Sequence, residues 1–169
     1  MAEMFLQKVI ERNPKLIEYG FELHNTGKIL PDTYVMDLDA IEANARKMKE
    51  VADHCGVELY FMLKQIGRNP LIAAKLMEVG FKGAVAVDFK EALCMIENGI
   101  HIANVGHLVQ IPKAALNRII GSRPDYVTVY SLEKIEEINE TAKELGIKQK
   151  LLIRLSDDDS ELYSGQEGG

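Results

Sequence analysis

Residues 57–99 read VELYFMLKQIGRNPLIAAKLMEVGFKGAVAVDFKEALCMIENG, and the order of apolar runs and helical segments here predicts the fold class. Two apolar runs, 57–64 and 83–88, have the composition of β-strands that are covered on both faces. Between them a helix is predicted over 70–80, because Asn69 is a good N-cap and Pro70 suits the first helical position. A second helix is predicted over 89–99. This order of elements predicts parallel strands joined by right-handed crossovers.

The same rhythm continues on both sides of this stretch. Further strands are predicted at 102–108, 125–131 and 148–156, and helices at 112–121 and 132–146, with Ser131 capping the latter. Upstream, TYVMDLD (33–39) is predicted as a strand and 40–56 as a helix, with Asp39 as its N-cap and Gly56 as its stop. The first 30 residues have a helical apolar pattern that ends in a turn at 25–27.

Two architectures share this rhythm, an open doubly wound sheet and a closed barrel. An open nucleotide-binding sheet carries a Gly-rich phosphate turn after its first strand, and neither MDLDAIEAN nor MLKQIGRNP contains one. The predicted fold class is therefore α/β, a parallel (β/α)8 TIM-type barrel. Without TYVMDLD the chain supplies about the first five β/α units of such a barrel, which typically takes about 250 residues. We expect an N-terminal helical arm (1–30) and a truncated barrel (31–169) from a larger protein; closure by another chain is the alternative.

The overall composition narrows the class of partner. Lys and Arg number 20 and Asp and Glu 26, a formal net charge of −6, and no basic block stands out. We therefore expect no nucleic-acid partner and no anionic membrane surface. No apolar run approaches the ~18 residues of a membrane span. Cys55 and Cys94 lie far apart and fit neither a metal knuckle nor a disulfide framework, which indicates a reducing, cytoplasmic setting.

Lys64 ends the apolar run 57–64 with a charge. In a parallel barrel the carboxyl ends of the strands form the active-site face. A lysine in a partly apolar mouth loses its proton more readily, and a free amine condenses with an aldehyde. The alternative is a lysine that extends from the core to water, and position alone favours that alternative.

Other polar residues follow the later predicted strands in the same way. Arg154 could bind an anion or a ring nitrogen in the mouth, or pair outward with a carboxylate of helix 132–146. His107 could stack on a cofactor, act as acid or base, or hydrogen-bond a loop carbonyl. Asp88 faces the mouth or, more simply, caps helix 89–99. Arg68 is a candidate for an anion of the substrate or cofactor.

The run Asp157-Asp158-Asp159 raises the question of a metal site. Loops that bind hard cations space their ligands and contain a sharp Gly turn. Adjacent carboxylates on a loop are more often a solvated charge run. We therefore predict no metal site in this chain.

In these segments the sequence resembles the alanine-racemase-like, fold-type III proteins that use pyridoxal 5′-phosphate (PLP). TYVMDLDAIEANARKM is similar to the family's entry segment, and MLKQIGRNP lies where the family has its PLP lysine. VAVDFKEALCMIENGI and LLIRLSDDDSELYSGQEGG resemble its second and fifth strand regions. NVGHLVQIPK is similar to the Ile-Gly-x-Leu-Gln segment of related PLP-homeostasis proteins. The combined pattern is closest to the YhfX-type branch.

The resemblance implies roles for these residues. Lys64 would hold PLP as a Schiff base and then act as general base on one face of the substrate, while Asp88, His107 and Arg154 would line the cofactor mouth. Alanine racemases have a Tyr where this chain has Arg68, which suggests a different and more anionic substrate. In this family the phosphate cradle comes from later strands.

The function we expect is therefore that of a PLP-dependent amino-acid racemase-like enzyme or lyase. Its partners would be a small-molecule amino acid and a second copy of the chain, in a homodimer. Two alternatives stay open: a non-catalytic protein that binds PLP for homeostasis, and an inactive truncated barrel.

Overall fold

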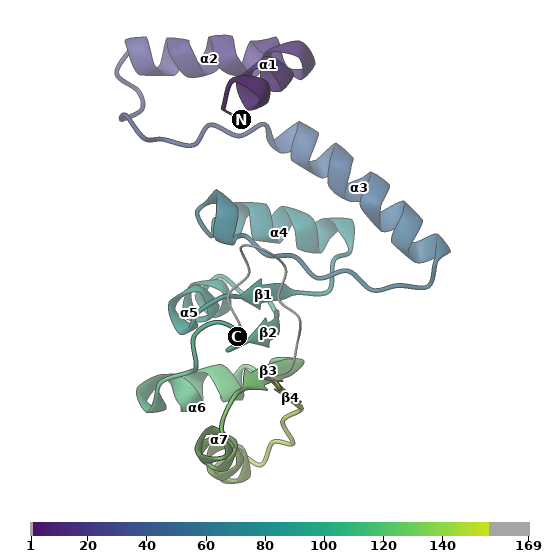
Figure 1. Ribbon diagram of the computed structural model, residues 1–169, viewed down its shortest axis with the longest axis vertical. Helices are drawn as coiled ribbons and strands as arrows, with labels where there is room; N and C mark the ends of the chain where they lie inside the picture. Colours follow the sequence, from purple (N-terminus) through teal and green to yellow (C-terminus); the bar gives the residue numbers. More distant parts are fainter. Residues whose placement is uncertain (1, 156–169) are drawn as a thin grey trace. The chain divides into compact units, whose positions relative to one another are not determined.

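Four short parallel strands form the sheet in the computed structural model, which describes residues 2–155. They are β1 (Ala84–Ala86), β2 (Ile102–Val105), β3 (Tyr126–Val129) and β4 (Leu151–Ile153), and they lie in sequence order (Figure 1). The helices α5 (Phe89–Glu97), α6 (Lys113–Gly121) and α7 (Leu132–Glu144) connect them, and α4 (Pro70–Val79) precedes β1. This succession of parallel β/α units is part of a (β/α)8 barrel, so the predicted fold class is confirmed.

The predicted strand 57–64 is present only in part. Phe61 forms a single parallel bridge to Ala84. The Phe61 N–H donates to the carbonyl of Gly83 at 3.1 Å, and the Val85 N–H donates to the carbonyl of Phe61 at 2.7 Å. The sequence predicts that Lys64 ends this strand. In the structure Lys64 instead begins the one-turn 3₁₀ helix η1 (Lys64–Ile66). The chain turns here because Gly67 and Arg68 both adopt left-handed backbone conformations.

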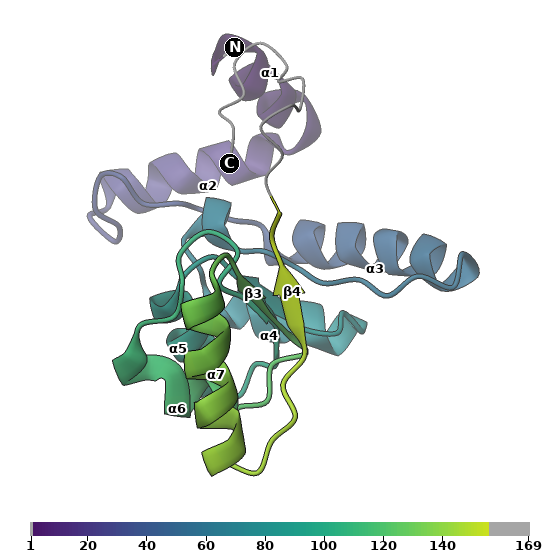
Figure 2. The ribbon, with the colours of Figure 1, turned by 60° about the horizontal axis from the view of Figure 1, so that its bottom comes forward.

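The core lies between the sheet and the helices that cover one of its faces (Figure 2). In β3, Val127 and Val129 are fully buried, whereas Tyr126 at the start of the strand is only half-buried. The most deeply buried large side chains come from both layers: Ile72, Met95, Ile102, Val105, Ile111, Ile119, Ile120, Val127, Val129 and Ile138. Burial on this scale makes the apolar face the main source of stability for the sheet.

Side-chain caps fix where several of the helices begin. The Asn69 side chain accepts a hydrogen bond from the Leu71 N–H at 2.9 Å, and Ser131 accepts one from the Lys134 N–H at 3.3 Å. Both caps were predicted from the sequence and are confirmed. Such caps satisfy N–H groups that have no partner within the helix, and each contributes about 1 kcal/mol.

The chain divides into two units, Met1–Ala45 and Arg46–Gly169, which are described separately. The first contains α1 (Ala2–Arg12), α2 (Pro14–Asn25) and the start of α3 (Leu38–His54). The helices predicted for the first 30 residues are therefore present. Among the described residues, no helix is both long enough and apolar enough to cross a membrane.

The predicted strand TYVMDLD (33–39) is wrong. Among the described residues no strand pairs with this segment, and α3 begins at Leu38. Asp37 takes the capping role predicted for Asp39, because its carboxylate accepts the Ala40 N–H at 2.9 Å. That hydrogen bond, together with one from the Asn13 side chain at 2.5 Å, lowers the pKa of Asp37. An alternating apolar pattern needs a partner strand, and here the local cap decides the conformation.

Candidate active site

Four of the predicted site residues follow the carboxyl ends of neighbouring sheet segments. Lys64 comes after the bridged segment at Phe61, and Asp88 comes after β1. His107 and Arg154 come after β2 and β4. Because the segments are parallel, their carboxyl ends share one edge of the sheet, and we call this edge the carboxyl edge. In a barrel this is the face where ligand sites form.

Lys64 presents an amine that the described residues leave unengaged. Its side chain is exposed, and no hydrogen bond or ion pair reaches it within residues 2–155. Its backbone is held more firmly, because Leu63 before it is buried and the Leu63 carbonyl accepts from the N–H groups of Ile66 and Arg68, both at 3.0 Å. A fixed backbone with a free amine suits a residue that reacts with a ligand.

Arg68 pairs with two carboxylates of the next β/α unit. Its Nη2 lies 3.5 Å from Asp88 Oδ2 and its Nε 3.4 Å from Glu91 Oε2. The other Asp88 oxygen accepts the Glu91 N–H at 2.8 Å, which confirms the simpler prediction that Asp88 caps α5. Sequence reasoning missed Glu91, whose side chain is only 1% exposed. A Glu in the first turn of an amphipathic helix gives no local sign that it will be buried.

The loop after β2 is anchored to β3 by one side chain. Gln110 Nε2 donates to the carbonyls of Gly106 at 2.6 Å and Thr128 at 3.1 Å. Gly106 has φ +98°, and a Cβ there would lie 2.5 Å from the Thr128 carbonyl oxygen. Two polar atoms, His107 Nδ1 and Gln110 Oε1, are buried without a hydrogen-bond partner among the described residues. Buried polar atoms without partners are rare, and they indicate a place where a ligand or water would be bound.

Arg154 lies over the ring of Tyr130, with 5.5 Å between its guanidinium carbon and the ring centroid. Its Nη1 also approaches the carbonyl of His107 at 3.5 Å. Within the described part of the chain it does not pair with a carboxylate of α7, so that alternative from the sequence is not observed. Its exposed guanidinium is therefore held near the loop that carries His107.

The chemistry at the carboxyl edge fits the cofactor that the family resemblance implies. PLP offers an aldehyde, a pyridine ring and a phosphate. The edge provides a free amine on Lys64, an imidazole with an unpartnered Nδ1 on His107, and a guanidinium on Arg154. Those groups match a carbonyl carbon, an aromatic ring and an anion, respectively.

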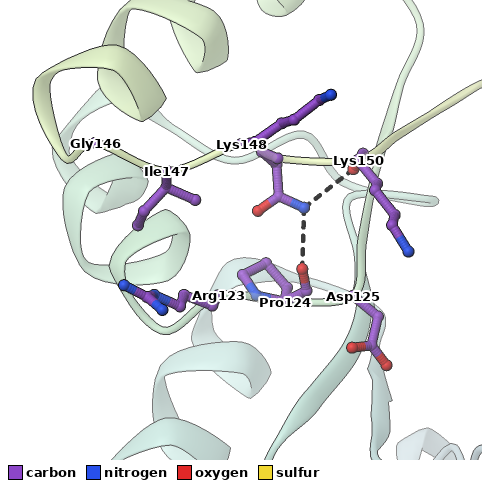
Figure 3. A pocket seen from close by; sticks show the side chains of 8 residues that line it. Arg123, Pro124, Asp125, Gly146, Ile147, Lys148 and Lys150 are labelled. Atoms are coloured by element: carbon purple, nitrogen blue, oxygen red, sulfur yellow. Dashed lines mark hydrogen bonds between the residues drawn. The ribbon is translucent and has the colours of Figure 1, made fainter.

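A surface hollow lies elsewhere, at the amino ends of β3 and β4. It has a volume of about 310 Å³ and is lined by residues 123–125 and 146–150. Gln149 crosses it, since its Nε2 donates to the carbonyls of Pro124 and Lys150, both at 3.0 Å. Figure 3 shows that Arg123, Lys148 and Lys150 point in different directions. Their charges do not converge on one ligand position, so we place the candidate site at the carboxyl edge instead.

The predicted acidic run 157–159 lies outside the described residues. Among those that the structure describes, no group of three or more His, Cys, Asp or Glu side chains could hold a metal ion. Cys55 and Cys94 are both free thiols.

Comparisons with known proteins identify the family. The family model for the alanine racemase N-terminal domain matches residues 36–162. The uncharacterized protein YhfX of Escherichia coli (strain K12) is 42% identical over 166 residues, which cover 98% of this chain and 43% of that protein. This chain therefore spans less than half the length of that relative.

Solved structures share the fold. A D-threonine aldolase from Filomicrobium marinum has a TM-score of 0.61 at 22% identity, covering 79% of this chain and 35% of that one. A diaminopimelate decarboxylase from Helicobacter pylori, complexed with L-lysine, has a TM-score of 0.57 at 22% identity, covering 71% and 30%. The family match and the shared fold agree with the resemblance to fold-type III PLP proteins. This chain belongs to the family of the alanine racemase N-terminal domain.

Proposed function

We propose that this protein is a PLP-dependent enzyme that acts on a small amino acid, with Lys64 as the residue that holds the cofactor. The observation that carries the proposal is the place of Lys64 at the carboxyl edge, on a backbone that is fixed by Leu63, with an amine that no described residue engages. Its exposed side chain is what the alternative of a lysine that extends to water also predicts, so the position in the fold carries the proposal. Membership of the alanine racemase N-terminal domain family supports it. When bound, PLP supplies an aldehyde that condenses with an amine, losing water, and a ring that withdraws electrons from the substrate's α-carbon.

Each residue at the carboxyl edge would have its own role. Lys64 Nζ would bind the cofactor and, once released, hold the proton taken from the α-carbon of the substrate. His107 would face the cofactor, where a polar atom of that ligand would give its buried Nδ1 a hydrogen-bond partner. Arg154 would bind an anionic group, and Asp88 would act through the backbone it caps and through Arg68.

Racemase-like and lyase chemistry both begin with these groups, and they differ in which bond to the α-carbon breaks. Solved relatives in fold are named as an aldolase of D-threonine and as a decarboxylase, and the latter was solved with L-lysine. These names support an amino acid as the class of substrate. We further propose a homodimer in the cytoplasm, and the two free thiols agree with a reducing compartment.

Cofactor attachment is tested first. The purified protein is incubated with PLP, reduced with borohydride and digested, and the peptides are mapped by mass. The expected result is a pyridoxyl group on Lys64, lost in Lys64→Ala. Lys113→Ala, which removes an exposed lysine from α6, is the matched control and should keep the label. Labelling that is spread evenly over the lysines, or that persists in Lys64→Ala, would refute the proposal.

Turnover is tested second. The PLP-loaded protein is incubated with amino acids in D₂O, and exchange of the α-hydrogen and optical rotation are followed. Exchange with loss of rotation indicates a racemase, whereas consumption of the amino acid indicates a lyase. The loop Gly106–Gln110, which resembles that of PLP-homeostasis proteins, favours a non-catalytic carrier as the second candidate. Specific labelling of Lys64 with no exchange for any amino acid would select that candidate.

A further inference from the structure

Glu91 is a buried carboxylate that the proposed function does not use. It lies in the first turn of α5 with a side chain 1% exposed. A buried charge is unfavourable unless hydrogen bonds and an opposite charge compensate it. Glu91 Oε2 accepts from the Val87 N–H at 2.8 Å and faces Arg68 Nε at 3.4 Å. The one carboxylate oxygen thus joins the end of β1 to a residue that follows η1.

Arg68 reaches Glu91 from a backbone conformation that few side chains adopt. Its φ is +57°, directly after Gly67 at φ +78°. A left-handed conformation is unfavourable for a residue with a Cβ. Such a conformation persists only where the surroundings stabilise it. Here the surroundings are the Leu63 carbonyl, which accepts the Arg68 N–H, and the carboxylates of Asp88 and Glu91.

The pair of Arg68 and Glu91 closes the loop that begins with Lys64. The loop runs from Lys64 to Arg68, and backbone hydrogen bonds to Leu63 fix its start. At its far end the loop continues into α4, and the Arg68 side chain adds a direct contact with Asp88 and Glu91 of the next β/α unit. This contact lies four residues from Lys64 and helps to hold the loop from which the Lys64 side chain extends.

We propose that Arg68 and Glu91 are positioning residues that aim Lys64 at the cofactor. This inference rests on the proposed function of Lys64. It differs from a role of Arg68 as a substrate contact, because the positioning role acts before any substrate is present. A misplacement of about 1 Å can slow a reaction on the order of 100-fold.

The test measures the rate at which Lys64 is labelled without substrate. Arg68→Asn is the main variant, because Asn tolerates the left-handed backbone but cannot reach Glu91. The matched control is Arg123→Asn, since Arg123 is a second arginine with a positive φ, +59°, at the amino end of β3. Labelling of the exposed Lys113 in the same digest is the internal reference for reagent and digestion. Because unfolding would also lower the Lys64 rate relative to the Lys113 rate, circular dichroism is used to verify that each variant keeps its helices.

The expected result is a fall of about 10- to 100-fold in the Lys64 rate relative to Lys113 in Arg68→Asn, with no change in Arg123→Asn. Glu91→Gln should lower the rate too, and adding it to Arg68→Asn should cause little further loss, because both act through one contact. Using pyridoxal, which lacks the phosphate, should give the same fall as PLP.

Three outcomes would overturn the inference. An unchanged Lys64 rate in Arg68→Asn would leave Arg68 as a contact of the substrate alone. A fall with PLP but not with pyridoxal would make it a contact of the phosphate. Additive losses in the double variant would mean that the two residues act separately. None of these affects the proposed function, which is tested in the wild-type protein and fails if labelling there is not specific to Lys64.

Discussion

Gly106 offers the sharpest test of how the carboxyl edge is built. Gly106→Ala places a methyl group 2.5 Å from the Thr128 carbonyl oxygen, on a backbone with φ +98°. The left-handed conformation costs Ala about 1–2 kcal/mol. Relieving the contact forces β2 and β3 to shift, at about 1–3 kcal/mol. We therefore expect the free energy of unfolding to fall by about 2–5 kcal/mol in total.

Gly99→Ala is the matched control. Gly99 also has a positive φ, +71°, but nothing lies within 4 Å of the position of its Cβ. Both substitutions remove the same conformational freedom from the unfolded chain, so that contribution cancels between them. The difference between the two variants then measures the contact with Thr128 alone, about 1–3 kcal/mol.

Urea unfolding followed by circular dichroism gives both values, and the slope with denaturant should stay constant between the variants. A melting experiment should show Gly106→Ala below Gly99→Ala by about 2–4 °C for each kcal/mol. Equal losses in the two variants would refute the reasoning. The close approach of β2 to β3 would then not be a constraint on the loop that carries His107.

Three further predictions concern polar groups elsewhere in the chain. Asn104→Ala leaves the buried Thr128 hydroxyl without its partner at 3.1 Å and should lower the free energy of unfolding by about 1–3 kcal/mol. The double variant Asn104→Leu with Thr128→Val should recover most of that stability. A double-mutant cycle that shows no coupling between the two positions would contradict this prediction. Burial, and next the Asp125 carboxylate, raise the pKa of Tyr60 above 10.0, so the contribution of Tyr60 to stability holds below pH 10 and is lost as the pH rises through the raised pKa. Ultraviolet titration measured against Tyr60→Phe should show a lower Tyr60 pKa in Asp125→Asn. An unchanged pKa would count against the contact between Tyr60 and Asp125. Because its pKa is lowered, Asp37 stabilises the first unit above pH 3.8, and this stabilisation is lost as the pH falls through the lowered pKa. Asp37→Asn should therefore lose less helicity on acidification than the wild-type protein. Identical curves of helicity against pH for the two proteins would contradict this prediction.

Helices were easier to predict from the sequence than strands. Asn69 and Ser131 cap helices through neighbours two or three residues away, so the information is local. Strands depend on partners that the local pattern does not contain. The segment 33–39 alternates like a strand yet pairs with no described strand. Among the described residues, the run 57–64 forms one bridge, at Phe61, and one further backbone hydrogen bond, from the Lys82 N–H to the Leu59 carbonyl at 2.9 Å.

The candidate site was predictable in its place but not in its contacts. A polar residue after an apolar strand indicates the carboxyl edge, which located Lys64 and His107 from the sequence. The pairing of Arg68 with Glu91 could not be inferred, because 23 residues separate them and nothing local marks a buried carboxylate. The same holds for Arg154 over Tyr130, which are brought together by the positions of β3 and β4.

The single bridge at Phe61 has a consequence for how this protein moves. Amide hydrogens that bond from one of the strands β1–β4 to another are released to solvent only when the sheet opens. The segment 59–61 is joined to 82–85 by three backbone hydrogen bonds and can open locally. The N–H groups of Phe61 and Val85 should therefore exchange with solvent faster than those of β3. Local opening of this kind would carry Lys64 away from the sheet while the rest of the sheet stays folded. Attachment of a ligand at Lys64 would then slow amide hydrogen exchange at the Phe61 bridge, three residues away.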